Sequence, residues 1–182
     1  KMMRRFGIIK NIRFNSTINV DKSTKGIYDN VLEQLREGLK ISIKQKLTFE
    51  KTAIRGIMSE MKNLQIDNHG TIINKFQIVD HFNKLIKQRE ETAKEYLSPN
   101  QPERFKELAE NEIKEIEIIK KYLALLPVAN DEDIKEKLKV IIENDKITDK
   151  RKLFSKIPWN KINEEWNASR STVSEVINKM DL

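Results

Sequence analysis

Apolar side chains recur at every third or fourth position along two stretches in the middle of the chain, residues 74–97 and 102–126. This spacing puts them on one face of an amphipathic helix, and neither stretch has the alternation that a half-buried strand would show. The pattern therefore predicts two long helices. The first apolar stripe consists of Phe76, Val79, Phe82, Ile86, Ala93 and Leu97, and the second of Phe105, Ala109, Ile116, Ile119, Leu123 and Leu126.

Three polar residues interrupt these stripes: Asn83 and Glu90 in the first, and Glu112 in the second. The link between the two stretches, residues 98–101, is too short for anything except an antiparallel return. Pro102 follows at a position where a helix tolerates the missing N–H, so we expect the second helix to begin there. Together the two stretches predict an αα-hairpin on which the rest of the chain docks.

Other periodic stretches predict helices before and after this hairpin. Thr48 and Asn130 are expected to cap two of them, because their side-chain oxygens accept hydrogen bonds from free N–H groups of a first turn. Gly38 lies inside a helical stretch although glycine costs up to about 1 kcal/mol relative to alanine, so we expect close packing there. These helices cover residues 27–46, 48–65, 131–144, 150–156, 158–166 and 171–180.

The predicted fold class is all-α, with four long helices that include the central αα-hairpin, followed by a small C-terminal helical domain. The pattern breaks at residues 127–129, which we interpret as a boundary. We therefore predict a leader at residues 1–20, an N-terminal helical domain at residues 21–127 and a small C-terminal helical domain at residues 128–182.

The net charge of +7 is unevenly distributed along the 182 residues. Residues 1–20 contribute +5 without an acidic residue, residues 21–46 contribute +2, and residues 47–182 are neutral. A binding surface that is basic over the whole molecule is therefore not predicted. The absence of cysteine excludes disulfides, thiolate metal sites and a cysteine nucleophile, and no apolar run is long enough to span a membrane.

The leader has the composition of a mitochondrial presequence. It contains arginines and no acidic residue, ends in a polar stretch, and has a short apolar face that includes Phe6, Ile9 and Ile12. Residues 13–16 resemble a processing site. The sequence therefore predicts a mitochondrial protein, in the matrix, and the competing interpretation is a basic tail.

The two histidines lack the spacing of a metal site. His69 lies in a predicted turn and His81 lies twelve residues later on a predicted helix, so no HxxxH pair forms. Asp67 and Asp80 are near them in sequence, but structural roles are the stronger interpretation. We predict no metal and no cofactor.

Carboxylates are abundant on the predicted hairpin, for example at Glu90, Glu91 and Glu115. Lysines and arginines accompany them at helical spacing, which is typical of solvated helix faces rather than of an acid–base pair. No GxSxG, P-loop or GxGxxG motif is present. The residues therefore predict no catalytic group.

The densest basic stretch beyond the leader covers residues 146–161, where six cations accompany Asp149 alone. Such side chains neutralise phosphates, and Trp159 or Trp166 has a ring that stacks on an exposed base. The competing interpretation is a solvated face with two core tryptophans. The predicted nucleic-acid-binding residues are Lys150, Arg151, Lys152, Lys156, Lys161 and Arg170.

Residues 161–178 also resemble the helix-turn-helix of repressor headpieces, in which the second helix enters the major groove of DNA. Arg170, Ser171 and Ser174 would then face the bases. Asn163 stands where that motif has a small apolar residue, and Asn167 stands where it has glycine. DNA binding is therefore the weaker of the two nucleic-acid hypotheses.

Beyond these patterns, residues 29–143 resemble the GatB/YqeY family, which comprises stand-alone bacterial proteins and the C-terminal tail domain of the GatB component of glutamine-dependent tRNA amidotransferase. The order and lengths of the predicted helices agree with this family. The residues that carry the resemblance are Arg55 with residues 59–63, residues 87–89, and residues 115–119 with Tyr122 and Leu123.

The resemblance implies a two-part, all-α protein without catalytic residues of its own. It implies a non-catalytic accessory or tRNA-binding module, associated with a carbon–nitrogen ligase that uses glutamine as its amido donor. The expected partners are tRNA and a mitochondrial protein. The alternative is a protein–protein adaptor that docks through the central hairpin, and fold analogy alone does not decide between these roles.

Overall fold

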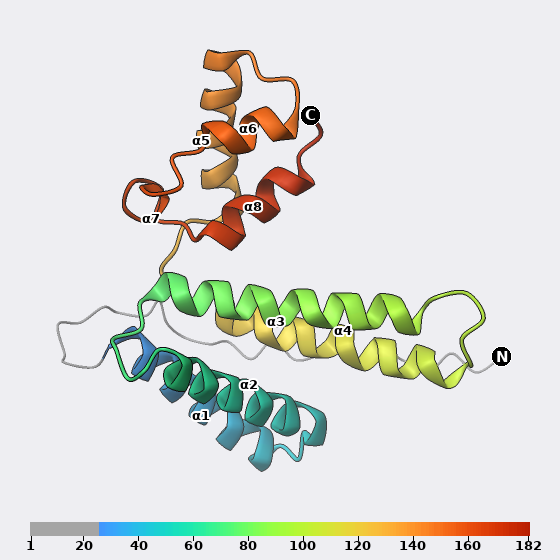
Figure 1. Ribbon diagram of the computed structural model, residues 1–182. Coiled ribbons are helices and arrows are strands. Elements are labelled where there is room, and N and C mark those ends of the chain that lie inside the picture. The colour runs from blue at the N-terminus through green and yellow to red at the C-terminus, as the bar shows by residue number, and fades with distance from the viewer. Residues whose placement is uncertain (1–25) are drawn as a thin grey trace.

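The computed structural model describes residues 26–182, and the predicted leader at residues 1–20 lies outside the described residues. The described chain consists entirely of helices and their connections, which confirms the all-α class (Figure 1). The helices are α1 (Ile27–Lys44), α2 (Thr48–Asp67), α3 (Lys75–Tyr96), α4 (Arg104–Leu123), α5 (Asp131–Asp145), α6 (Lys150–Lys156), α7 (Ile162–Glu165) and α8 (Arg170–Lys179).

Helices α3 and α4 form the predicted central hairpin, and they lie side by side along most of their length (Figure 1). A capping box starts α3, because the Asn74 side chain accepts from the Gln77 N–H while the Gln77 side chain accepts from the Asn74 N–H. The position of Pro102 was predicted wrongly. Residues 102–103 form a turn in which the Phe105 N–H donates to the Pro102 carbonyl, and α4 begins at Arg104.

Two further details of the predicted helices needed correction. Thr48 is the first residue of α2 and not its cap, since Leu47 occupies that position without a side-chain hydrogen bond. The helix predicted at 158–166 is reduced to α7, because the Lys161 N–H donates to the Pro158 carbonyl and closes a turn there. Asn130 caps α5 as predicted, accepting from the Asp133 N–H.

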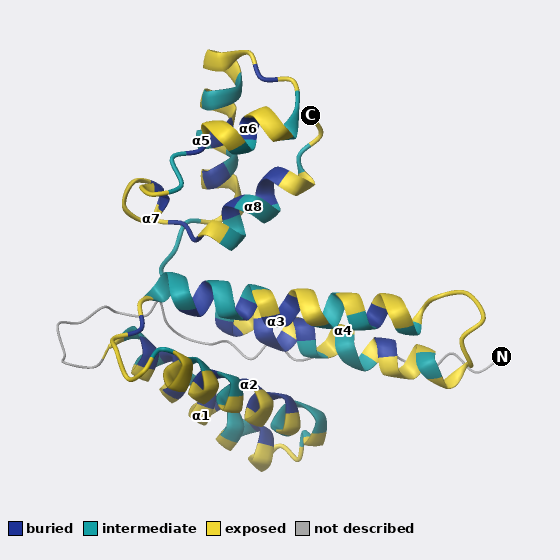
Figure 2. Ribbon diagram, viewed as in Figure 1, coloured by how far each residue is buried: buried dark blue, intermediate teal, exposed yellow. Residues whose placement is uncertain are grey.

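Buried apolar side chains form two separate clusters (Figure 2). One lies among α1–α4, which we call the N-terminal bundle, and the other among α5–α8, the C-terminal bundle. Phe82, Leu35 and Met61 are fully buried in the first, and Leu153 and Ile177 in the second. Each bundle therefore has its own hydrophobic core.

The connection between the bundles, residues 127–130, is held by main-chain and side-chain hydrogen bonds. The Ala129 N–H donates to the Asn167 carbonyl at 2.8 Å, and the Asn167 side-chain amide donates to the Pro127 carbonyl at 3.2 Å. Lys75, at the start of α3, donates to the Pro127 carbonyl and to Asn167 Oδ1. The linker, α3 and the turn before α8 therefore meet at one point.

Gly38 on α1 lies against the side chain of Tyr122 on α4. A Cβ at this position would overlap the hydroxyl group of Tyr122, and it would also touch the side chain of Ile54. Burial raises the pKa of Tyr122 to about 12. The close packing expected at Gly38 is therefore present.

We expect the substitution Gly38→Ala to destabilise the protein by about 1–3 kcal/mol, because overlap with Tyr122 outweighs the gain of up to about 1 kcal/mol in helix propensity. Chemical denaturation measures this change. Gly56→Ala is the matched control, since Gly56 is exposed on α2 and nothing lies within 4 Å of its added Cβ. It should stabilise the protein slightly, and equal effects of the two substitutions would contradict the packing argument.

Candidate nucleic-acid interface

Helix α6 carries four of the six predicted basic residues, Lys150, Arg151, Lys152 and Lys156. Asp149 caps the helix by accepting from the Lys152 N–H at 2.9 Å. Leu153 is fully buried and anchors α6 to the core, which leaves Arg151, Lys152 and Lys156 exposed. The short helix thus separates an apolar side from a cationic one.

Most of these cations already have a partner. Lys152 lies 3.7 Å from Asp149, Lys156 lies 3.3 Å from Asp145, and the Lys150 ammonium donates to the Asn178 carbonyl at 2.8 Å. Lys161 similarly lies 3.6 Å from Glu165 on α7. Exposed ion pairs of this kind contribute about 0–1 kcal/mol, so a phosphate can replace the carboxylates at little cost.

Arg151 and Arg170 make no ion pair within the described residues. Arg170, the first residue of α8, lies over the ring of Trp159, with its guanidinium carbon 5.1 Å from the ring centroid. Arginine in this position is held by a cation–π contact while its N–H groups stay available. All six predicted residues therefore lie in α6, at the start of α7 or at the start of α8.

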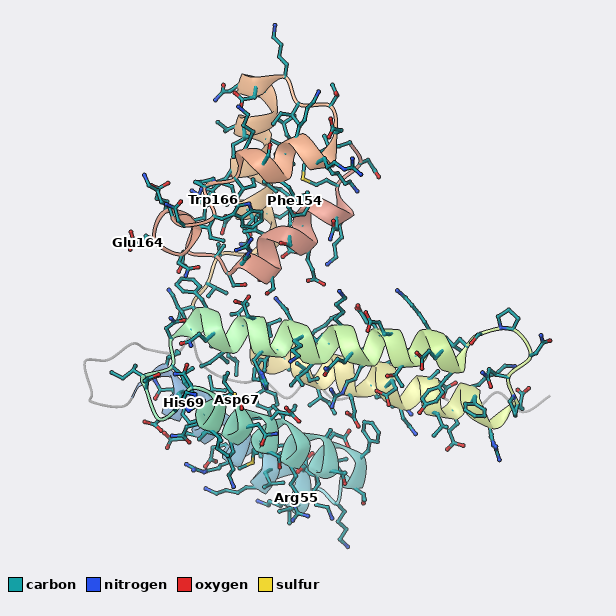
Figure 3. All side chains as sticks on the ribbon, viewed as in Figure 1. Arg55, Asp67, His69, Phe154, Glu164 and Trp166 are labelled. Carbon is teal, nitrogen blue, oxygen red and sulfur yellow. The ribbon has the colours of Figure 1, made fainter. Side chains whose placement is uncertain are left out.

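The two tryptophans have different roles. Trp159 is half-buried, stacks on Phe154 with centroids 5.8 Å apart, and donates its indole N–H to the Phe154 carbonyl at 2.9 Å. Trp166 is buried in the C-terminal core, and Figure 3 shows both Phe154 and Trp166 within that bundle. Trp159 is the more exposed of the two, but Phe154 and Arg170 already contact its ring, so the guanidinium plane of Arg170 is the group placed to meet a base, and Trp166 has a structural role.

The start of α8 is occupied by α3, which affects the helix-turn-helix hypothesis. The Asn83 amide donates to the hydroxyl groups of Ser171 and Thr172 at 2.8 and 3.1 Å. The Ser171 N–H donates to Asp80 at 3.2 Å. Ser171 therefore contacts α3 with both its N–H and its hydroxyl group, so this geometry does not favour insertion of α8 into a DNA groove.

These contacts explain the role of Asn83, which the sequence analysis did not predict. Asn83 interrupts the apolar stripe of α3 because that position meets α8 instead of the N-terminal core. Glu90, the second interruption, lines a cleft of about 480 Å³ between the bundles, together with Lys120 from α4 and Glu175 from α8. The interruptions in the stripe were the available signal for an interface.

The third interruption, Glu112, belongs to a polar cluster on the hairpin. Arg89 on α3 donates to Glu115 on α4 at 2.7 Å. Burial and the neighbouring Glu115 raise the pKa of the Glu112 carboxyl. This arrangement joins the two helices of the hairpin.

The two histidines belong to different elements of the structure. His69 is exposed in the turn after α2, near Asp67, as labelled in Figure 3. His81 on α3 lies 3.6 Å from Glu60 on α2, and burial lowers its pKa. Among residues 26–182 no group of three or more potential ligands is placed to hold a metal ion, and no helix there is long and apolar enough to cross a membrane.

Comparison with known proteins assigns this architecture to a class. The family model described as Yqey-like protein matches residues 32–180, which include nearly all of both bundles. The chain therefore belongs to the YqeY-like family, as the motif residues predicted.

Curated relatives agree with this assignment and are fungal. The chain is similar to "Altered inheritance of mitochondria protein 41, mitochondrial" of Komagataella phaffii, with 37% identity over 82% of each chain. The protein of the same name from Clavispora lusitaniae is 38% identical over 82% of this chain and 86% of the relative. The one from Candida glabrata is 33% identical over 91% and 87%.

The contact between α3 and α8 leads to a test. We expect Asn83→Ala to destabilise the docking of α8 by about 1–2 kcal/mol, because two half-buried hydroxyl groups lose their donor. Amide hydrogen exchange of the first turn of α8 should accelerate, while exchange in the N-terminal core stays unchanged.

Thr92→Ala on the same helix is the matched control, since the Thr92 hydroxyl donates only to the Gln88 carbonyl of its own helix. It should leave exchange in α8 as in the wild type. Unchanged protection of α8 in Asn83→Ala would show that the hydrogen bonds of Asn83 do not hold the bundles together.

Proposed function

We propose that this chain is a mitochondrial, non-catalytic accessory protein that binds tRNA through the basic face of its C-terminal bundle. The names of its fungal relatives and the acid-free, arginine-containing leader support a mitochondrial location, which we place in the matrix. We also propose that residues 21–127 and 128–182 are separate domains, each containing one hydrophobic cluster.

The observation that carries the tRNA proposal is the arrangement of Arg170 over Trp159 beside the exposed cations of α6. Phosphate neutralisation needs cations on the surface, and single-stranded bases need an aromatic or guanidinium plane to stack on. Folded tRNA presents both phosphates and unpaired loop bases. The exposed cations of α6 together with Arg170 of α8, which we call the α6–α8 face, have a matching feature for each.

The resemblance to the tail domain of the amidotransferase suggests how such binding would be used. We propose that this protein holds tRNA while a separate glutamine-dependent carbon–nitrogen ligase carries out the chemistry. The catalytic residues would then belong to that partner, and this chain would supply affinity for tRNA. Amidotransferase association and tRNA binding are thus two parts of one proposal.

A charge-reversal variant tests the proposal. We expect Arg151→Glu/Lys152→Glu/Lys156→Glu to weaken binding of the full chain to mitochondrial tRNA and to lower the salt slope by about 2–3, since each lost phosphate contact removes about 0.7–0.9. Fluorescence anisotropy over a salt series measures both quantities. Lys150 is left in place because it bonds the end of α8.

A variant with the same charge change on α3 and α4, Lys87→Glu/Lys94→Glu/Lys106→Glu, is the matched control and should bind tRNA like the wild type. A DNA duplex of similar length is measured in parallel and should bind more weakly. Unchanged tRNA affinity in the α6 variant would rule out this face as the interface.

A second candidate function, protein–protein adaptor, is favoured by exposed apolar residues on the hairpin, two of them near its tip. Leu97, Leu108 and Ile113 are 56%, 41% and 48% exposed. Tyr96 and Phe105 pack on each other nearby, with ring centroids 5.4 Å apart. Exposed apolar side chains of this kind fit contact with a partner protein.

For the adaptor function we expect Leu108→Lys to leave the free energy of unfolding within about 0.5 kcal/mol of the wild type, because the side chain is exposed. The same substitution should reduce the amount of at least one mitochondrial protein that co-purifies with the chain, as measured by quantitative affinity purification. Thr92→Ala serves again as a control with full recovery. Equal recovery of every partner from the Leu108 variant would exclude the hairpin tip.

A further inference from the structure

The turn that joins α1 to α2 carries cations that make no ion pair within the described residues. Lys44 and Lys46 are exposed at the end of α1, and Arg55 follows Lys51 by one helical turn on α2. Ile43, Lys46 and Lys51 line one shallow hollow of about 250 Å³. We call Ile43, Lys44, Lys46, Lys51 and Arg55 the turn surface.

Nearby acidic residues do not neutralise the turn surface. Glu50, which precedes Lys51 on α2, lines a separate small cavity with Lys121 and Tyr122 of α4. Glu37 is paired with Lys40 at 2.7 Å. The positive potential at this turn is therefore less compensated than that on α6, where Asp145 and Asp149 each contact a lysine.

An exposed apolar side chain lies among these cations. Ile43 is 51% exposed and belongs to the same hollow as Lys46 and Lys51. Phosphates of a nucleic acid gain nothing from an isoleucine, and the aromatic residue that follows the turn, Phe49, is half-buried with Lys114 over its ring. A lipid interface favours both features. Cations attract anionic headgroups, and an apolar side chain is buried among the acyl chains, away from water.

The position of the turn also suits a flat partner. Figure 1 shows the turn at the end of the α1–α2 pair, on the side of α3 and α4 opposite to the C-terminal bundle. Arg55, labelled in Figure 3, points away from α3 and α4. We propose that the turn surface docks this protein peripherally on a membrane rich in anionic phospholipid, independently of the α6–α8 face.

Vesicle binding tests the proposal. The full chain should co-sediment with vesicles that contain anionic phospholipid, in a salt-sensitive way, and not with purely zwitterionic vesicles. Lys44→Gln/Lys46→Gln/Lys51→Gln should weaken this binding roughly 100-fold, since each cation near an anionic surface contributes on the order of a fivefold gain. Ile43→Ser should weaken it roughly three- to tenfold through lost apolar burial.

Because residues 1–20 are themselves basic, the comparison is repeated in a chain that begins at residue 21, which keeps every residue of both hydrophobic clusters. The triple lysine variant should reduce vesicle binding both in the full chain and in the chain that begins at residue 21. Thermal unfolding checks that the variants stay folded, as expected for substitutions at the surface.

The charge-reversal variant of Arg151, Lys152 and Lys156 separates this proposal from the tRNA proposal. It should keep vesicle binding. The Lys44→Gln/Lys46→Gln/Lys51→Gln variant, which we call the turn variant, should keep tRNA binding. Equal binding of wild type and turn variant to anionic vesicles would overturn the assignment, as would binding of the wild type to zwitterionic vesicles alone. Loss of tRNA binding in the turn variant, without loss of vesicle binding, would make the turn a nucleic-acid contact instead.

Discussion

The arrangement of the molecule depends on α3, because this helix packs against two different sets of neighbours. Its apolar residues, such as Phe82, are buried with α1, α2 and α4 in the N-terminal core. Its polar residues Asp80 and Asn83 bond the start of α8 in the C-terminal bundle. An apolar residue at position 83 would remove the hydrogen bonds to the hydroxyl groups of Ser171 and Thr172, each of which contributes about 0.5–1.5 kcal/mol.

The contact between the bundles is therefore polar, whereas each bundle interior is apolar. Hydrogen bonds from Lys75 and Asn167 to the Pro127 carbonyl hold the linker against the start of α3. Polar contacts of this kind are individually weak, and interfaces that rely on them permit relative movement more readily than large apolar ones. The cleft lined by Glu90 and Glu175 lies along this same contact.

The distribution of charged side chains over the surface differs from what the net charge of the chain suggests. On α6, Lys152 and Lys156 lie beside Asp149 and Asp145, so phosphate binding at these two lysines would exchange one ion pair for another. At the α1–α2 turn Lys46 and Lys51 have no such neighbour, since Glu50 faces α4.

The sequence by itself determined the helices, because apolar periodicity and capping residues act over a few positions. The stripe from Val79 to Ala93 and the cap at Asn130 were both predictable in this way. The start of α4 was not, since residues 102–103 turn before the helix forms. Only the tertiary structure decided that Trp166 is in the core while Trp159 lies beneath Arg170, and that Asn83 meets Ser171, 88 positions later. Such contacts join side chains that are distant in the chain, and periodicity contains no information about which distant residue will fill a polar position.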